Sequence, residues 1–137
     1  VAPRIVDPSD RTEDSARRFP TLWSLVAKAL GRANALDYEI GSSSFSPDWI
    51  AGMFMLFASD AFRAVGGFDA KYFLYYEDVD ICARLRAADY DVRLVPAASA
   101  VHDARRASRS DWRHRAWHLQ SIARYLMTTG RAPVRRP

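Results

Sequence analysis

Four stretches of the chain carry the apolar spacing or the end signals of a helix: residues 22–30, 60–65, 78–88 and 110–129. Thr21 stands where the N-cap of the first helix is expected, and Gly31 is expected to end it. Ser59 is the expected cap of the second helix, and Gly66 and Gly67 are expected to end it. The last helix is expected to bury an apolar face made of Trp112, Ala116, Leu119, Ile122, Ala123 and Leu126.

Strands are predicted where short apolar runs are bounded by turn residues. The best candidate is segment 49–58, which is apolar on both faces, as a central strand between helices should be. Shorter strands are predicted at residues 4–6, at 92–95, where Pro96 stops the strand, and at 99–102. The alternation of helices and strands indicates an α/β fold. With so few strands and no glycine-rich phosphate loop, either another segment completes the sheet or the domain is small and unusual.

The composition is that of a folded, soluble protein. Of the 137 residues, 49% are hydrophobic, and there are 16 acidic and 20 basic side chains. No apolar run reaches the length of about 18–20 residues that a membrane-spanning helix needs. The only cysteine, Cys82, cannot form a disulfide within the chain, which is compatible with a cytoplasmic location. Because the first residue is Val1 rather than methionine, we expect the chain to begin inside a longer reading frame.

Charge is distributed unevenly along the chain. Residues 1–104 carry 11 basic and 15 acidic side chains, whereas residues 105–137 carry nine arginines and one aspartate. The basic end favours an anionic partner, which could be nucleic acid, a phosphorylated ligand or an anionic membrane surface. Nucleic acid is the poorest of these, because the aromatic residues lie in apolar segments instead of alternating with the arginines.

A dense cluster of carboxylates, Glu77, Asp78 and Asp80, follows the aromatic run at residues 72–76. Neighbouring carboxylates can raise the pKa of one of them, which suits a general base, or can bind a divalent cation. Acidic residues also occur at helix N-termini for dipole and capping reasons alone. Asp78 and Asp80 form a DxD string, but positions i and i+2 of a helix do not share a face, so we prefer a base over a metal clamp.

His102 follows a predicted strand, where a strand end would open onto a ligand crevice. A neutral imidazole there could ligate a metal, and an ordinary surface histidine fits the local sequence as well. Arg105 and Ser108 belong to a run of arginines and serines before the last predicted helix, which is a candidate diphosphate-binding patch. Contact with membrane lipid and a solvated run of charges are the alternatives for this patch.

Five segments follow one another in a characteristic order: Arg17-Arg18-Phe19-Pro20-Thr21-Leu22, Trp49-Ile50-Ala51-Gly52, Gly66-Gly67-Phe68-Asp69, Tyr76-Glu77-Asp78-Val79-Asp80 and Val95-Pro96-Ala97 to His102. In this order they resemble family 2 of the glycosyltransferases, which are inverting enzymes of the GT-A type, and especially its bacterial rhamnosyltransferase-like members. The resemblance covers almost the whole chain. The ordered series is more specific than any single segment.

The resemblance implies an incomplete GT-A fold of the α/β class, made of the acceptor-side part of the sheet and its flanking helices. Residues 1–130 would form the C-terminal, acceptor-binding and catalytic-base part of a glycosyltransferase domain, and residues 131–137 a basic tail. The family's nucleotide-binding half, with the DxD that holds the metal, has no counterpart in this sequence. Residues 104–107 also lack the glycine that the family often has there.

The resemblance makes Asp78 the general base that takes the proton of the acceptor hydroxyl, with Glu77 in support. His102 would be a ligand of the divalent cation, Mg²⁺ or Mn²⁺, that neutralises the leaving nucleoside diphosphate. The implied substrate-binding residues are Trp49, Gly52, Asp80, Arg105 and Ser108.

The implied function is transfer of a sugar from a nucleotide-sugar donor to a glycan or lipid-linked acceptor, with inversion, in the synthesis of bacterial surface polysaccharide. Because the donor-binding half is missing, the isolated chain is expected to be inactive. The expected location is cytoplasmic, with peripheral contact at the inner face of the plasma membrane. The alternative is a non-catalytic module that binds a glycan or an anionic membrane.

Overall fold

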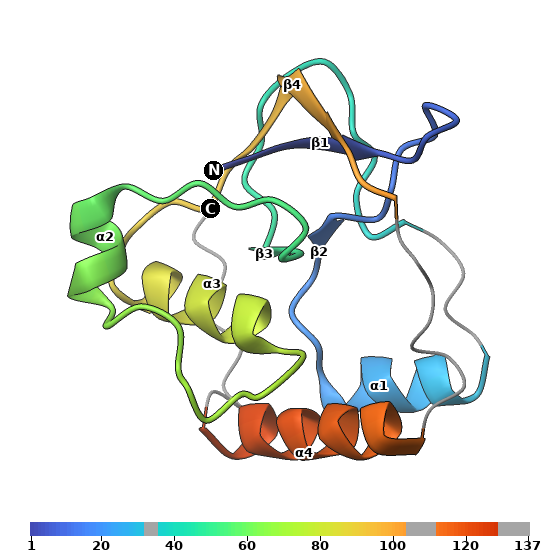
Figure 1. Ribbon diagram of the computed structural model, residues 1–137, viewed down its shortest axis with the longest axis vertical. Helices are drawn as coiled ribbons and strands as arrows, with labels where there is room; N and C mark the ends of the chain where they lie inside the picture. The colour runs from blue at the N-terminus through green and yellow to red at the C-terminus, as the bar shows by residue number, and fades with distance from the viewer. Residues whose placement is uncertain (32–35, 104–111, 129–137) are drawn as a thin grey trace.

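The computed structural model describes residues 1–31, 36–103 and 112–128. Within these ranges the chain is mixed α/β, as predicted, and its elements in chain order are β1 (Ala2–Val6), β2 (Ala16–Arg17), α1 (Leu22–Ala29), β3 (Trp49–Ile50), α2 (Ser59–Ala64), α3 (Glu77–Ala87), β4 (Leu94–Val101) and α4 (Trp112–Thr128). Figure 1 shows β1 and β4 at the top, α3 and the β2–β3 pair at mid-height, and α1 and α4 along the bottom.

β1 and β4 form a parallel pair whose register is broken once. Pro3 lies opposite Val95, whereas the next residue of β1, Arg4, lies opposite Ser99. The residues between Val95 and Ser99 therefore have no partner on β1, and the first of them, Pro96, has no N–H to donate. The sequence predicted two strands separated at Pro96, and the structure has one strand with an irregularity there.

Segment 49–58 is not the long central strand that its composition predicts. Only its first two residues form β3, which pairs antiparallel with β2. Beyond β3 the backbone bonds to other segments: the Gly52 N–H donates to Asp78, and the Leu56 N–H donates to the Val1 carbonyl at 2.9 Å. The prediction was wrong because an apolar run shows that a segment packs inward without showing where its backbone bonds go.

α1 and α2 begin and end close to the predicted positions. The Thr21 Oγ1 accepts the Ser24 N–H at 3.1 Å, and the Ser24 Oγ accepts the Thr21 N–H at 2.8 Å, which makes a capping box. Gly66 and Gly67 follow α2 with φ of 77° and 69°, so the predicted glycine stop is confirmed. The predicted cap of α2, Ser59, is wrong by one residue, because the preceding alanine is the N-cap.

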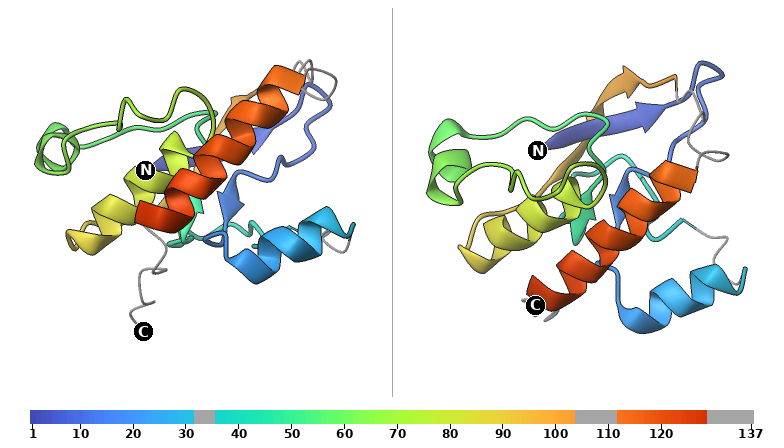
Figure 2. Two further views of the ribbon diagram at one scale, coloured as in Figure 1. Left: turned by 90° about the horizontal axis from the view of Figure 1, so that it is seen from below. Right: turned by 60° about the horizontal axis from the view of Figure 1, so that its bottom comes forward.

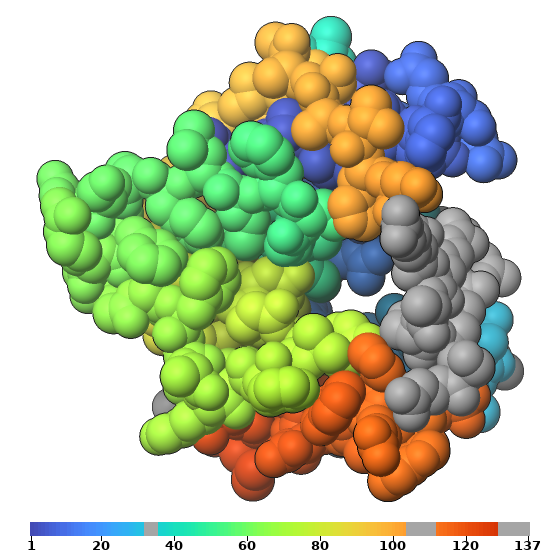
Figure 3. Space-filling model, in the orientation of Figure 1, coloured from blue at the N-terminus to red at the C-terminus, as the bar shows by residue number. Residues whose placement is uncertain are grey.

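α4 turns inward only part of the face that its apolar spacing predicts, because Ile122 and Leu126 pack against the core and the rest of that face does not. Ser121 and Tyr125 are buried, whereas Trp112 and Leu119 are 72% and 66% exposed. The inward face carries aromatic rings that contact the loop before α3, and Figure 3 shows this loop lying directly on α4. These ring contacts, which the helical period does not reveal, set the rotation of the helix.

The core lies between α3 and β3. Ile81 and Cys82 of α3 are fully buried, and Ile50 of β3 is 1% exposed. Most of α3 is enclosed in this way, so its N-terminal turn is held in a fixed place. No helix in the described ranges has the length and apolar character needed to cross a membrane.

Candidate active site

Asp78, the candidate base, lies in the first turn of α3 and is held by two backbone N–H groups. Its Oδ2 accepts the Gly52 N–H and its Oδ1 accepts the Val79 N–H, each at 2.8 Å. A Cβ on Gly52 would stand 3.5 Å from Oδ2, so the loop after β3 passes close beside the carboxylate. The structure thus brings together two residues that the sequence assigns to one site.

Burial raises the pKa of Asp78 above its usual value. The N–H groups of Gly52 and Val79 and the positive charge of Arg17 act in the opposite direction without cancelling the effect of burial. A carboxylate whose pKa is raised takes a proton more readily than a free aspartate does. This is a property of a general base.

Glu77 is the first residue of α3 and lies beside Asp78 in the same turn. Burial raises the pKa of Glu77, and the charge of Asp78 acts in the same direction. The Glu77 Oε2 is buried and has no hydrogen-bond partner among the described residues. A hydroxyl of a ligand that donated to this oxygen would satisfy it.

Tyr75 and Tyr76, immediately before α3, both have left-handed backbone conformations, with φ of 69° and 67°. Two consecutive non-glycine residues in this region are strained. Contacts with α4 hold them in place: the Tyr75 hydroxyl lies 3.0 Å from His114 Nδ1, and the Tyr76 and Tyr125 ring centres are 5.5 Å apart. α4 therefore supports the turn that presents the two carboxylates.

Asp80 is buried, with 5% exposure, and its Oδ2 accepts the Arg84 Nε–H at 2.8 Å. The Arg84 guanidinium also donates to the Val65 carbonyl at the end of α2. Asp80 and Arg84 thus form an i,i+4 pair, and the two carboxylates of the DxD string have different partners, as expected when both lie within a helix. The substrate-binding role of Asp80 stays a prediction.

Trp49 is 8% exposed, and its Nε1 donates to the Arg18 carbonyl at 2.8 Å. The Arg17 guanidinium lies 5.5 Å from the Trp49 ring centre and pairs with Asp14 at 2.9 Å. The structure therefore places the Trp49 indole in the core with Arg17 over its ring. The contact of Trp49 with an acceptor sugar stays a prediction. Arg17 belongs to the site because its charge acts on Asp78. The sequence did not single it out, since this closeness arises only when β2 pairs with β3.

His102 lies just beyond β4, and its N–H donates to the Val6 carbonyl at 2.9 Å. Its Nδ1 is buried without a hydrogen-bond partner in the described part of the chain, which suits a metal ligand. No group of three or more His, Cys, Asp or Glu side chains in the same ranges could hold an ion, so the described residues alone do not fit a bound divalent cation. No hydrogen bond among them joins His102 to Asp78. Arg105 and Ser108 lie outside the described residues.

Residues 35–108, more than half of the chain, match the model of a family described as the N-terminal domain of galactosyltransferase. The chain belongs to this glycosyltransferase family. The part of the chain that matches this glycosyltransferase family contains Gly52, Asp78 and His102, whereas Arg17 and α4 lie outside it.

Named rhamnosyltransferases are also similar to the chain. Rhamnosyltransferase WbbL of Escherichia coli (strain K12) is 39% identical over 115 residues, which cover 82% of this chain and 44% of that protein. N-acetylglucosaminyl-diphospho-decaprenol L-rhamnosyltransferase of Mycobacterium tuberculosis (strain CDC 1551 / Oshkosh) is 32% identical over 149 residues, which cover 98% of this chain and 48% of that protein. The chain thus spans about half the length of the curated relatives it matches. No solved structure matches this glycosyltransferase chain.

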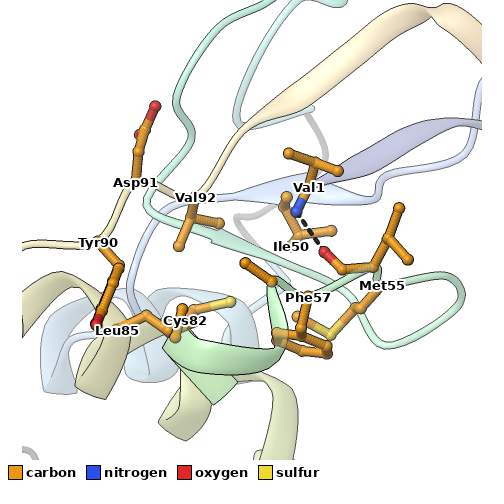
Figure 4. Close-up of a pocket in the computed structure, with 12 residues that line it drawn as sticks. Val1, Ile50, Met55, Phe57, Cys82, Leu85, Tyr90, Asp91 and Val92 are labelled. Carbon is orange, nitrogen blue, oxygen red and sulfur yellow. Dashed lines mark hydrogen bonds between the residues drawn. The ribbon is translucent and has the colours of Figure 1, made fainter. Parts of the chain in front are cut away.

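A cavity of about 440 Å³ lies between Val1, the segment after β3 and α3 (Figure 4). Its lining is mainly apolar and includes Cys82, and Figure 4 shows Asp91 pointing away from the other labelled side chains. Burial raises the pKa of the Cys82 thiol to about 11, so the thiol is protonated near neutral pH. Asp78 does not line this cavity, which is separate from the candidate active site.

Proposed function

We propose that this chain supplies the acceptor side and the catalytic base of an inverting glycosyltransferase of the GT-A type. The proposal rests on the setting of Asp78 at the start of α3. Its carboxylate is half-buried, two backbone N–H groups hold it in place, and burial raises its pKa. The chain covers only 44% and 48% of its relatives, which supports a complete enzyme in which a separate nucleotide-binding half completes the domain. On this proposal the 137 residues alone do not catalyse transfer.

In the proposed reaction Asp78 takes the proton of an acceptor hydroxyl while the hydroxyl oxygen attacks the anomeric carbon of the donor sugar. The bond between that carbon and the diphosphate oxygen breaks, and its electron pair leaves with the nucleoside diphosphate. Attack on the face opposite the leaving group inverts the configuration. The Gly52 N–H holds Asp78 in one orientation, and Glu77 Oε2 would accept a hydrogen bond from the acceptor.

The proposed substrates follow from the names of the relatives. These names include rhamnosyl transfer, and one of them contains an N-acetylglucosaminyl-diphospho-decaprenol acceptor. We therefore propose a nucleotide-activated rhamnose as the donor and a glycan or lipid-linked sugar as the acceptor. The reaction would serve the synthesis of bacterial surface polysaccharide on the cytoplasmic side of the membrane. Arg17, whose charge acts on Asp78, is a candidate contact for an anionic part of either substrate.

The proposal includes a divalent cation, Mg²⁺ or Mn²⁺, which would supply positive charge to the leaving diphosphate. His102 would be one ligand, because its Nδ1 is buried without a partner among the described residues. The further ligands would have to come from outside the described residues, as would the contacts of Arg105 and Ser108 with the diphosphate.

Replacing Asp78 with asparagine in the complete protein that contains this chain tests the proposed function. Asp78→Asn keeps the shape of the side chain but cannot take a proton, so kcat for rhamnosyl transfer should fall at least about 100-fold. Donor affinity measured by calorimetry should change less than about twofold, since the base acts on the acceptor.

Asp60→Asn is the matched control, because the Asp60 side chain is 93% exposed on α2 and its loss should leave transfer unchanged. Turnover of Asp78→Asn above about a tenth of the control rate would remove Asp78 from the base role. A product with retained anomeric configuration would exclude the single displacement. Transfer by the 137 residues alone would contradict the division into two halves.

A further inference from the structure

α1 leaves its large apolar side chains uncovered. Leu22, Trp23 and Val26 are 64%, 82% and 43% exposed, and Leu30, the C-cap, is 67% exposed. α1 lies wholly within the described range 1–31, and none of its residues is buried. At about 100° per residue, the four exposed side chains fall within one sector of about 100°. The large apolar side chains of this helix therefore face solvent instead of the core.

α4 has a second uncovered apolar face. Trp112, Leu119 and Met127 are 72%, 66% and 80% exposed, and by helical geometry they fall within a sector of about 80°. Ser121 and Tyr125, the buried residues of α4, lie on the opposite side of the helix. Trp112 and Leu119 of the face that the sequence assigned to the core, together with Met127, are therefore exposed to solvent, whereas Ile122 and Leu126 pack against the core.

These two helices lie on the same side of the molecule. Both run along the bottom in Figure 1, and the left view of Figure 2, which looks from below, shows α4 crossing in front of the strands with α1 to one side of it. Contiguous exposed apolar patches on a protein surface mark sites that bind protein or membrane.

The charged residues within α1 and α4 are all basic. The sequences of α1 and α4 contain Lys28 and three arginines and no aspartate or glutamate. Residues 104–111 and 129–137, which flank α4 in the sequence, contain six more arginines and one aspartate. Helices with leucine and tryptophan on one side and only cationic charges around them are typical of segments that lie in the interface of an anionic bilayer. A protein partner for an apolar face carries no such requirement for uniform positive charge.

We propose that α1 and α4 form a docking face for an anionic membrane surface. The docking face consists of the exposed apolar side chains Leu22, Trp23, Val26, Leu30, Trp112, Leu119 and Met127. These side chains enter the boundary between headgroups and acyl chains, and the surrounding lysine and arginines attract acidic lipid. The inference does not rest on the proposed transfer reaction, so Asp78→Asn should bind vesicles as the original chain does.

Vesicle binding by the complete protein that contains this chain tests this proposal. Phosphatidylcholine vesicles with and without phosphatidylglycerol are floated with the protein, and the partition coefficient is measured at low and high salt. We expect binding to the anionic vesicles that weakens as salt rises. Trp23→Ser/Leu119→Ser should lower the partition coefficient at least about tenfold, because each change removes apolar area from the bilayer. Both side chains are exposed, so circular dichroism should show an unchanged fold.

Val101→Ser is the matched control, since Val101 is 70% exposed but lies on β4, and its change should leave the partition coefficient unaltered. Lipids with brominated acyl chains should quench the fluorescence of Trp23 and Trp112 in bound protein, while the buried Trp49 is spared. Equal binding of the chain and the double variant would overturn the proposal, as would no preference for anionic vesicles. A dimer in sedimentation that Trp23→Ser/Leu119→Ser dissociates, without vesicle binding, would assign the face to a second copy instead.

Discussion

The Gly52 N–H donates to Asp78 Oδ2 at 2.8 Å and so joins the loop after β3 to the first turn of α3. The bond stabilises the ionised carboxylate and opposes the rise in the pKa of Asp78 that burial causes. It also fixes the direction of the side chain, which a base needs in order to meet its acceptor. The loop after β3 therefore affects both the pKa of Asp78 and the direction in which its carboxylate points.

Replacing Gly52 with proline removes this N–H. In Gly52→Pro the pKa of Asp78 should rise further, because burial is then opposed by one donor fewer. Loss of a hydrogen bond to a charged group should also lower the free energy of unfolding by about 1.5–3 kcal/mol. Titration of the Asp78 carboxyl carbon by NMR measures the first effect, and urea unfolding measures the second.

Gly52→Ala is the matched control for the proline variant. It keeps the N–H, and its Cβ would lie 3.5 Å from Asp78 Oδ2, an ordinary contact distance. The pKa of Asp78 should therefore stay at its value in the original chain. An identical titration of Asp78 in the proline variant would show that the bond does not control this pKa.

Glu77→Gln should stabilise the fold at neutral pH. Burial raises the pKa of Glu77 in the folded state, so the folded protein holds this proton more tightly than the unfolded chain does. The contribution to stability is fully present below the unfolded pKa of about 4.3 and is lost as pH rises through the folded pKa. Glu77→Gln should therefore stabilise the fold at pH 7, and the gain should vanish near about pH 3, where the carboxyl is protonated in both states.

Urea unfolding of both proteins at several pH values measures this difference. Glu39→Gln, a change of the same chemistry at an exposed position, is the control and should not alter the curve. A Glu77→Gln variant less stable than the original chain at pH 7 would mean that the ionised carboxylate has a stabilising partner.

Arg84→Met should destabilise the fold by about 3 kcal/mol, because it leaves the buried Asp80 carboxylate without the guanidinium that pairs with it at 2.7 Å. It also removes the donor to the Val65 carbonyl at the end of α2. The double variant Asp80→Asn/Arg84→Met removes both members of the ion pair and should regain part of the loss. Thermal or urea unfolding of the single and double variants measures the coupling, and additive losses would show that the pair does not interact.

Cys82 should resist alkylation in the folded chain. The thiol is fully buried and burial raises its pKa to about 11, so only about a thousandth of it is thiolate at pH 8. Modification by iodoacetamide, followed by mass spectrometry, should therefore proceed at the rate at which the protein unfolds and should become fast in urea. Rapid labelling of the folded protein would show that the cavity beside α3 opens to solvent.

Local signals explain which elements the sequence predicts correctly. Thr21 and the pair Gly66-Gly67 act within one turn of the helices they bound, so a capping side chain or a glycine stop is visible in the sequence itself. The end of the β3 strand and the rotation of α4 depend on partners far along the chain. The Gly52–Asp78 bond spans 26 residues and the Tyr75–His114 contact spans 39, so no short pattern reveals them.

The same difference between local signals and long-range partners explains which parts of the candidate site the sequence predicts. Glu77 and Asp78 were recognisable as a carboxylate cluster at a helix start, and the structure places them there with Gly52 beside them. Arg17 could not be predicted, because its effect on Asp78 requires β2 to pair with β3. The left-handed turn before α3 was also hidden, because its tyrosines carry none of the glycine or asparagine signals of that conformation.

That turn couples the motion of α4 to that of the carboxylates. Tyr75 and Tyr76 have left-handed backbones, and their rings rest on His114, His118 and Tyr125 of α4, so we expect these contacts to stabilise the turn. If α4 opens, the two tyrosines relax to ordinary conformations and the first turn of α3 loses its anchor. Amide protons at the start of α3 should therefore exchange with solvent together with those of α4, and faster than those in the middle of α3. We therefore expect the opening of α4 to limit how long Glu77 and Asp78 keep their positions at the start of α3.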